Sequence, residues 1–159
     1  MNFDSAFKIL LKHEGGYSNH KHDRGGATMW GVTEKVAREH GYAGDMRHLP
    51  MELAKSIYRK MYWDSVRADE LPGAVRFSVF DAAVNSGVDR AIKWLQEAVG
   101  AKADGAFGPQ TMAAIKEQDP ANLNAKYNGT RLAFMASLST WDSFGKGWAR
   151  RIASNLVGA

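Results

Sequence analysis

The sequence contains no cysteine among its 159 residues, only four prolines and no long hydrophobic run. Without thiols the chain cannot form a disulfide scaffold, a thiolate nucleophile or a cysteine-based zinc or iron–sulfur site. Its apolar stretches fall far short of the roughly 20 residues that span a bilayer, so we expect no stable membrane insertion. Residues 1–12 lack the features of a signal peptide and predict a cytoplasmic protein.

Dense runs of basic residues are also missing, although the net charge is +4. Residues 89–159 hold nine Lys or Arg against six Asp or Glu, and Arg150-Arg151 is only a pair. A nucleic-acid footprint is usually denser, so nucleic acid is not the expected partner. The surplus favours an anionic polymer such as one in a cell wall, with simple solubility as the alternative.

Apolar residues at helical spacing dominate the chain and predict a mainly helical α+β protein. A helix over residues 3–14, capped by Asp4 or Ser5, precedes a glycine-rich stretch in which residues 17–18 and 28–33 predict a short β-hairpin. The other expected helices run from Thr33 to His40, from Pro50 to Met61 and from Gly73 to Asn85, and over residues 89–99, 110–118, 121–138 and 144–156.

Two of the later helices show a clear apolar stripe, which predicts a buried face. In the last helix this stripe is Phe144, Trp148, Ile152 and Leu156; in residues 121–138 it is Leu123, Tyr127, Thr130, Phe134 and Leu138. Gly87 is the best candidate for a domain boundary, but the residues around it do not have the composition of a linker. We therefore predict two subdomains that share one core, residues 1–88 and residues 89–159.

Glu14 ends the predicted first helix and opens a loop at Gly15-Gly16. A carboxylate at a helix C-terminus lies near partial negative charge, which raises its pKa. An apolar wall from Tyr17 or Trp30 would raise this pKa further by desolvation. A carboxyl group that stays protonated near neutral pH can act as the general acid of glycosidic cleavage. The alternative is a solvated glutamate at a frayed helix end.

Asp23 lies nine positions after Glu14, across the predicted hairpin. In sugar hydrolysis, two carboxyl groups have different roles: one donates a proton, and the other activates water or stabilises positive charge. The hydroxyl of Thr28 is a candidate for hydrogen bonding to the water. The competing interpretation of Asp23 is an Asx turn before Arg24.

Histidines gather in the same stretch and raise the question of a metal. His13, His20 and His22 are present with Asp23, but no H-E-x-x-H or similar spacing occurs. We therefore expect neither a metal nor another cofactor.

The remaining candidates have both structural and functional interpretations. Asp81 and Asn85 lie one helical turn apart and either line a cleft or form a buried network. Four aromatic residues are candidates either for stacking on sugar rings or for filling the core: Trp30, Tyr58, Tyr62 and Trp63.

Three segments in order carry a resemblance to a known family: Glu14-Gly-Gly-Tyr17, Asp23-Arg-Gly-Gly-Ala-Thr28 and Trp30-Gly-Val-Thr33. They closely resemble the start of glycoside hydrolase family 108, to which Tyr62-Trp-Asp64 and the run from Phe80 to Gly87 are also similar. Four downstream elements resemble a peptidoglycan-binding segment: Leu95-Gln96, Asp104-Gly105, Phe107-Gly-Pro109 and Thr111. The chain departs from the family pattern at His20 and Arg24.

The resemblance implies a lysozyme-like fold and a phage endolysin-type muramidase. Such an enzyme hydrolyses the β-1,4 bond between N-acetylmuramic acid and N-acetylglucosamine in bacterial peptidoglycan, with Glu14 as catalytic acid. Asp23 and Thr28 complete the expected catalytic set. Tyr17, Trp30 and Asn85 are the expected substrate-binding residues, to which the resemblance adds Phe107.

The same resemblance implies a monomer that stays in the host cytoplasm until lysis releases it to the wall. Two other functions remain open at this point. One is a lytic transglycosylase that uses a lone glutamate on the same bond. The other is a non-catalytic protein that binds peptidoglycan or assists secretion.

Overall fold

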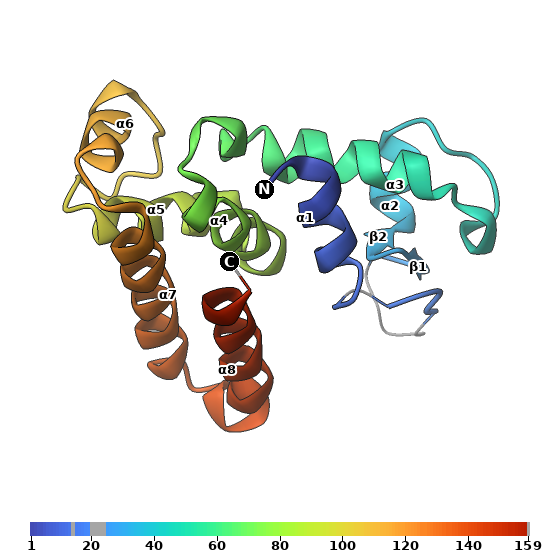
Figure 1. Ribbon diagram of the computed structural model, residues 1–159. Helices are drawn as coiled ribbons and strands as arrows, with labels where there is room; N and C mark the ends of the chain where they lie inside the picture. Colours follow the sequence, from blue (N-terminus) through green and yellow to red (C-terminus); the bar gives the residue numbers. More distant parts are fainter. Residues whose placement is uncertain (14, 20–24, 159) are drawn as a thin grey trace. The chain divides into compact units, whose positions relative to one another are not determined.

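The computed structural model describes residues 1–13, 15–19 and 25–158, and it is mainly helical with one small antiparallel sheet (Figure 1). The chain forms two compact units, Asn2–Met61 and Tyr62–Ala159, the second of which includes Met1. Among the helices of the described residues, none has the length and apolar character needed to cross a membrane. The predicted fold class is confirmed.

The first unit begins with α1 (Phe3–Leu10), which differs from its prediction at both ends. Its N-cap is Asn2, whose side chain accepts a hydrogen bond from the Ser5 amide at 3.0 Å, rather than Asp4 or Ser5. The helix ends at Leu10 instead of 14, because the amides of Lys12 and His13 bond to carbonyls three residues back. Such tightening of the last turn is common at helix ends.

The rest of this unit differs from the prediction in its strand pairing. Residues 17–18 were predicted to pair with 28–33, whereas the hairpin joins β1 (Thr28–Met29) to β2 (Val32–Thr33), and Ser18 forms an isolated bridge to Thr28. As predicted, Thr33 caps α2 (Glu34–Glu39), through a bond from the Val36 amide. A 3-10 turn, η1 (Met46–His48), leads to α3 (Met51–Tyr58) and a π-helical turn, η2 (Arg59–Trp63).

The core of the first unit joins α1 to α3. The rings of Phe7 and Tyr58 have centroids 5.5 Å apart, and Phe3 stacks on Phe7 at 5.9 Å. All three side chains are buried. Tyr58 is therefore a core residue, as one of its two interpretations predicted.

The second unit consists of η3 (Ala68–Glu70), α4 (Gly73–Ser86), α5 (Val88–Ala98), α6 (Pro109–Lys116), α7 (Pro120–Ala136) and α8 (Trp141–Val157). Helix α4 packs against α5 and α7, and α7 packs against α8. The predicted boundary after residue 88 separates α4 from these partners, whereas the division by packing falls between Met61 and Tyr62.

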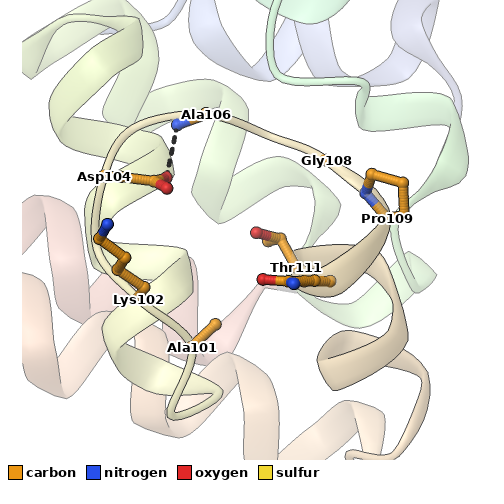
Figure 2. Close-up of a pocket in the computed structure, with 8 residues that line it drawn as sticks. Ala101, Lys102, Asp104, Ala106, Gly108, Pro109 and Thr111 are labelled. Carbon is orange, nitrogen blue, oxygen red and sulfur yellow. Dashed lines mark hydrogen bonds between the residues drawn. The ribbon is translucent and has the colours of Figure 1, made fainter.

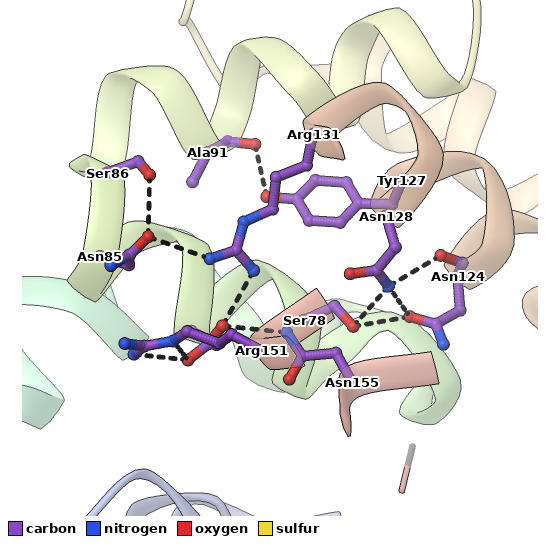
Figure 3. A network of polar contacts seen from close by, with 11 residues as sticks. Ser78, Asn85, Ser86, Ala91, Asn124, Tyr127, Asn128, Arg131, Arg151 and Asn155 are labelled. Carbon is purple, nitrogen blue, oxygen red and sulfur yellow. Dashed lines mark hydrogen bonds and ion pairs between the residues drawn. The ribbon is translucent and has the colours of Figure 1, made fainter. Parts of the chain in front are cut away.

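A buried carboxylate organises the second unit (Figure 3). Asp81 on α4 accepts hydrogen bonds from Arg131 on α7 at 2.9 Å, and from Arg151 and Asn155 on α8 at 2.8 and 2.9 Å. Burial alone would raise the pKa of Asp81, but the two guanidinium groups and these bonds hold the pKa below its ordinary value. Asp81 thus belongs to a structural network rather than to a cleft.

This network changes which faces of the last two helices are buried. In α8 the buried positions are Gly145, Ile152 and Asn155, whereas Phe144 and Leu156 are 57% and 48% exposed. The predicted apolar stripe is therefore wrong for those two residues. In α7 the buried set includes polar residues that the stripe omitted: Asn124, Asn128 and Arg131. A buried ion pair requires partners on several helices, so polar side chains take positions that periodicity assigns to apolar ones.

Candidate active site

The two predicted catalytic carboxylates, Glu14 and Asp23, lie outside the described residues, as does His20. The structure does show the segments on either side of them. Because α1 ends at Leu10, it does not reach the position predicted for Glu14 at a helix terminus.

The hairpin forms a compact frame next to these residues. Thr28 pairs with Thr33 and Met29 with Val32, and the turn residues Trp30 and Gly31 have φ of 54° and 75°. Positive φ at both central residues is what a type I′ hairpin turn requires.

A separate backbone bridge closes the stretch that contains Asp23. The amide of Ser18 donates to the carbonyl of Thr28 at 2.9 Å, and the amide of Thr28 donates back at 2.7 Å. The two ends of residues 19–27 are therefore fastened to each other beside β1.

The glycine pair Gly25-Gly26 permits a close approach between this stretch and the start of α2. A Cβ atom on Gly25 would lie 2.8 Å from Cγ2 of Thr33, and one on Gly26, whose φ is +76°, would lie 3.0 Å from a carboxylate oxygen of Glu34. Larger residues would clash or strain the backbone there. The pair thus has a packing role in the first unit.

Thr28 uses its hydroxyl in the local structure. The Oγ1 atom donates to the carbonyl of Ser18 at 3.4 Å, near the limit for such a bond, and the side chain is half-buried. A long bond of this kind leaves the two lone pairs of the hydroxyl available to a water molecule.

Trp30 and Tyr17, the two aromatic substrate-binding candidates of this unit, differ in how firmly the structure holds their side chains. The indole Nε1 of Trp30 donates to the carbonyl of Leu49 at 3.1 Å, and the Trp30 carbonyl accepts from the Tyr58 hydroxyl at 3.0 Å. Trp30 is therefore held rigidly at the hairpin turn. Tyr17, by contrast, is 45% exposed. Trp63, the other tryptophan with a proposed stacking role, is completely buried and packs on Phe80.

In the second unit, a loop before α6 is held by one buried side chain. The amide of Gln96 donates to Asp104 Oδ1, to the Ala106 carbonyl and to Thr111 Oγ1 at 3.0–3.1 Å, and its Oε1 accepts from the Gly105 amide. A cavity of about 400 Å³ lies beside this loop, lined by residues that include Lys102, Asp104, Gln110 and Thr111 (Figure 2). Gln96 was part of the resemblance, but spacing alone did not predict this clamp.

Phe107 and Asn85 occupy different neighbourhoods of the second unit. The guanidinium of Arg67 lies 5.0 Å from the Phe107 ring centroid and donates to the Phe107 carbonyl at 3.3 Å. Asn85, at the end of α4, is exposed and accepts from Arg131 at 3.3 Å. It lines a second cavity, of about 260 Å³, between α5, α7 and α8.

The described residues hold no cluster of three or more potential metal ligands. The side chains described above offer hydroxyl, amide, guanidinium and aromatic groups instead. These groups suit the recognition of a carbohydrate, whose hydroxyl groups need hydrogen-bond partners and whose ring faces stack on aromatic side chains.

The fold and these groups define a helical, lysozyme-like protein whose hairpin unit carries a glycine-rich segment between residues 15 and 28. The family model described as Glycosyl hydrolase 108 matches residues 7–87, and the one described as Predicted Peptidoglycan domain matches residues 90–153. The chain therefore belongs to glycosyl hydrolase family 108, and the resemblance found in the sequence is confirmed.

A solved structure supports the same assignment. The chain is similar to Brucella abortus SagA, with 34% identity and a TM-score of 0.84, over 98% of this chain and 91% of that one. No curated protein sequence matches it. The combination of the two matched regions makes the protein a glycoside hydrolase that acts on peptidoglycan and binds it.

Proposed function

We propose that the protein is a muramidase that hydrolyses the β-1,4 bond between N-acetylmuramic acid and N-acetylglucosamine. In this mechanism Glu14 protonates the leaving oxygen. Asp23, with the Thr28 hydroxyl, positions a water molecule or stabilises the oxocarbenium-like transition state. No cofactor takes part in these steps.

The observation that carries the proposal is the bridge between Ser18 and Thr28. Glu14 precedes Ser18 by four residues and Asp23 precedes Thr28 by five, so the bridge ties the carboxylate-bearing segment to the hydroxyl of Thr28. The family match over residues 7–87 includes this whole segment.

The decisive experiment is the substitution Glu14→Gln, which keeps the size of the side chain but removes its transferable proton. General acid catalysis contributes about 10²–10⁴-fold in rate, so clearing of a sacculus suspension should fall by that factor. Glu39→Gln, at an exposed position on α2, is the matched control and should retain the parent rate. A folded Glu14→Gln protein that clears sacculi near the parent rate would contradict the proposal.

Mass spectrometry of the released fragments separates the remaining functions. Hydrolysis leaves reducing N-acetylmuramic acid ends, whereas a lytic transglycosylase leaves 1,6-anhydro ends. A protein that sediments with sacculi but releases no fragments would be a non-catalytic binder.

The comparison of Asp23→Asn with Thr28→Val assigns the second catalytic role. If Asp23 is an essential base, its substitution should cost about as much rate as Glu14→Gln; if it only orients water, the cost should be smaller. Thr28→Val should cost less than either, because a hydroxyl contributes one hydrogen bond to the water.

The role in lysis is part of the same proposal. On this basis the enzyme is held in the host cytoplasm as a monomer until it is released to the wall. Cell fractionation before and after permeabilisation of the membrane tests the location, and sedimentation of the purified chain tests the monomeric state. Protein found in the wall fraction of intact cells would contradict the stated location.

A further inference from the structure

Two cavities described above are lined by residues of the second unit, and the smaller one has the more unusual lining. It is about 260 Å³ in volume and lies between α5, α7 and α8. We call it the Trp94 cavity; its lining includes Asn85, Arg90, Trp94, Phe134, Leu138 and Trp148. It is smaller than the ~300–1,000 Å³ typical of sites for drug-sized ligands, and suits a single sugar ring.

A buried indole forms part of the wall of the Trp94 cavity. Trp94 is 1% exposed, and its indole Nε1 has no hydrogen-bond partner among the residues that the structure describes. Buried polar groups in folded proteins nearly always have a partner, so the wall of this cavity contains an unsatisfied donor.

Positive charge without a counter-ion lies in the same cavity. The guanidinium of Arg90 lies 4.3 Å from the centroid of the Phe134 ring, and no carboxylate in the described ranges forms an ion pair with it. The Phe134 ring in turn packs edge-on against Trp94 at 5.5 Å. A cation fixed over an aromatic ring is oriented before any ligand arrives, which favours capture of an anion.

Exposed aromatic surface continues outward from the cavity. Trp148 packs against Trp141 at 6.1 Å and against Phe144 at 5.8 Å, and Phe144 is 57% exposed. Leu138, at the rim, is 37% exposed. The aromatic rings among these side chains offer flat faces on which sugar rings stack.

The larger cavity, beside the loop before α6, is less suited to an anionic sugar. Its polar groups already bond to Gln96. A hydrogen bond from the Ala106 amide, together with Gln96, holds the pKa of Asp104 below its ordinary value, so this carboxylate is charged at neutral pH. Lys102 on the same rim offsets that charge without reversing it.

We propose that the Trp94 cavity binds one N-acetylated amino sugar that bears a carboxylate, the chemistry of an N-acetylmuramic acid residue in the glycan strand. Arg90 pairs with the carboxylate, the Asn85 amide bonds to polar atoms of the sugar, and Trp148 stacks on the ring beside the buried Trp94. The inference rests on the proposed function in its choice of ligand, but it concerns binding and not cleavage.

Titration of the full-length protein with free N-acetylmuramic acid, followed by NMR of the tryptophan indole N–H signals, tests the proposal. A free monosaccharide has no glycosidic bond, so the outcome does not depend on the catalytic mechanism. The Trp94 signal, assigned with Trp94→Phe, should shift saturably. N-acetylglucosamine, which lacks the carboxylate, should bind about tenfold more weakly.

Arg90→Gln should make the affinities for N-acetylmuramic acid and N-acetylglucosamine equal. Two control variants, Gln110→Ala at the other cavity and Arg150→Gln on the exposed surface of α8, should leave both affinities within twofold of the parent. If Arg90→Gln does not fold, the isosteric Asn85→Asp decides, since an added negative charge should weaken N-acetylmuramic acid selectively. An unchanged Trp94 signal with both sugars, or equal affinities in the parent protein, would overturn the proposal.

Discussion

The unit Asn2–Met61 keeps its ion pairs at the surface, whereas the unit Tyr62–Ala159 buries one at its centre. Arg38–Glu34, Arg47–Asp45 and Lys55–Asp4 are all partly exposed, but the side chains of Asp81 and Arg131 are completely buried. Exposed pairs add little stability, while a buried pair becomes costly when one partner is lost. The two units therefore depend on different interactions.

This difference matches the division of labour that we propose. The predicted catalytic carboxylates belong to the unit held by a small apolar core, caps and a hairpin. The proposed sugar-binding cavity belongs to the unit that a buried charge network fixes. Substitutions in the first unit should then alter chemistry more than stability, and substitutions at the network in the second should alter stability first.

Arg131→Met should have the largest effect on stability, because it leaves the buried Asp81 carboxylate with one guanidinium fewer. Removing one partner of a buried ion pair costs about 3–5 kcal/mol, which urea denaturation would show as a lower midpoint. Arg150→Met, at the exposed neighbouring position on α8, should stay within about 0.5 kcal/mol of the parent. Equal midpoints for the two variants would remove the contrast between the units.

Gln96→Met should have the next largest effect. It deletes three hydrogen bonds to the loop before α6 and a fourth to the buried Thr111 hydroxyl on α6, which loses its donor. Since buried groups left unpaired cost about 1–3 kcal/mol, the unfolding free energy should drop by about that amount. Gln110→Met, at an exposed position in the first turn of α6, is the control, and a similar loss in both would show that Gln96 does not clamp the loop.

Thr33→Ala tests the first unit and should cost less, about 1 kcal/mol. Its side chain accepts the Val36 amide at the start of α2, and an alanine cannot cap a helix. Thermal unfolding would measure the loss. Thr130→Ala, an exposed position inside α7, should change little. A loss as large as that of Arg131→Met would show that the first unit depends on this cap as strongly as the second depends on its network.

Acid should weaken the second unit through protonation of Asp81. Because the pKa of Asp81 is lowered on folding, its contribution to stability is fully present above the ordinary aspartate pKa, about 3.9. That contribution is lost as the pH falls through the lower, folded-state pKa. Urea midpoints measured at pH 6 and pH 3 should therefore differ less in Arg131→Met than in the parent. An identical acid response in both would contradict the role of Arg131.

Local sequence signals predicted most of the elements correctly because each depends on neighbouring residues. Thr33 caps α2 and Pro72 precedes α4 as expected, whereas the hairpin closes within residues 28–33, around Trp30-Gly31, and not between 17–18 and 28–33 as predicted. The end of α1 was wrong by four residues, since the glycines at 15–16 mark where a helix must have stopped and not where its last turn tightens. Helix boundaries depend on such small differences.

The sequence by itself determined the family, the mainly helical class and the order of the elements, because motifs and periodicity are properties of consecutive residues. Only the tertiary structure decided which side chains are buried in α7 and α8. Arg131 and Arg151 lie 50 and 70 residues from Asp81 along the chain, yet both bond to its carboxylate. That buried charge draws polar residues inward and leaves Phe144 at the surface, where it extends the aromatic lining of the Trp94 cavity.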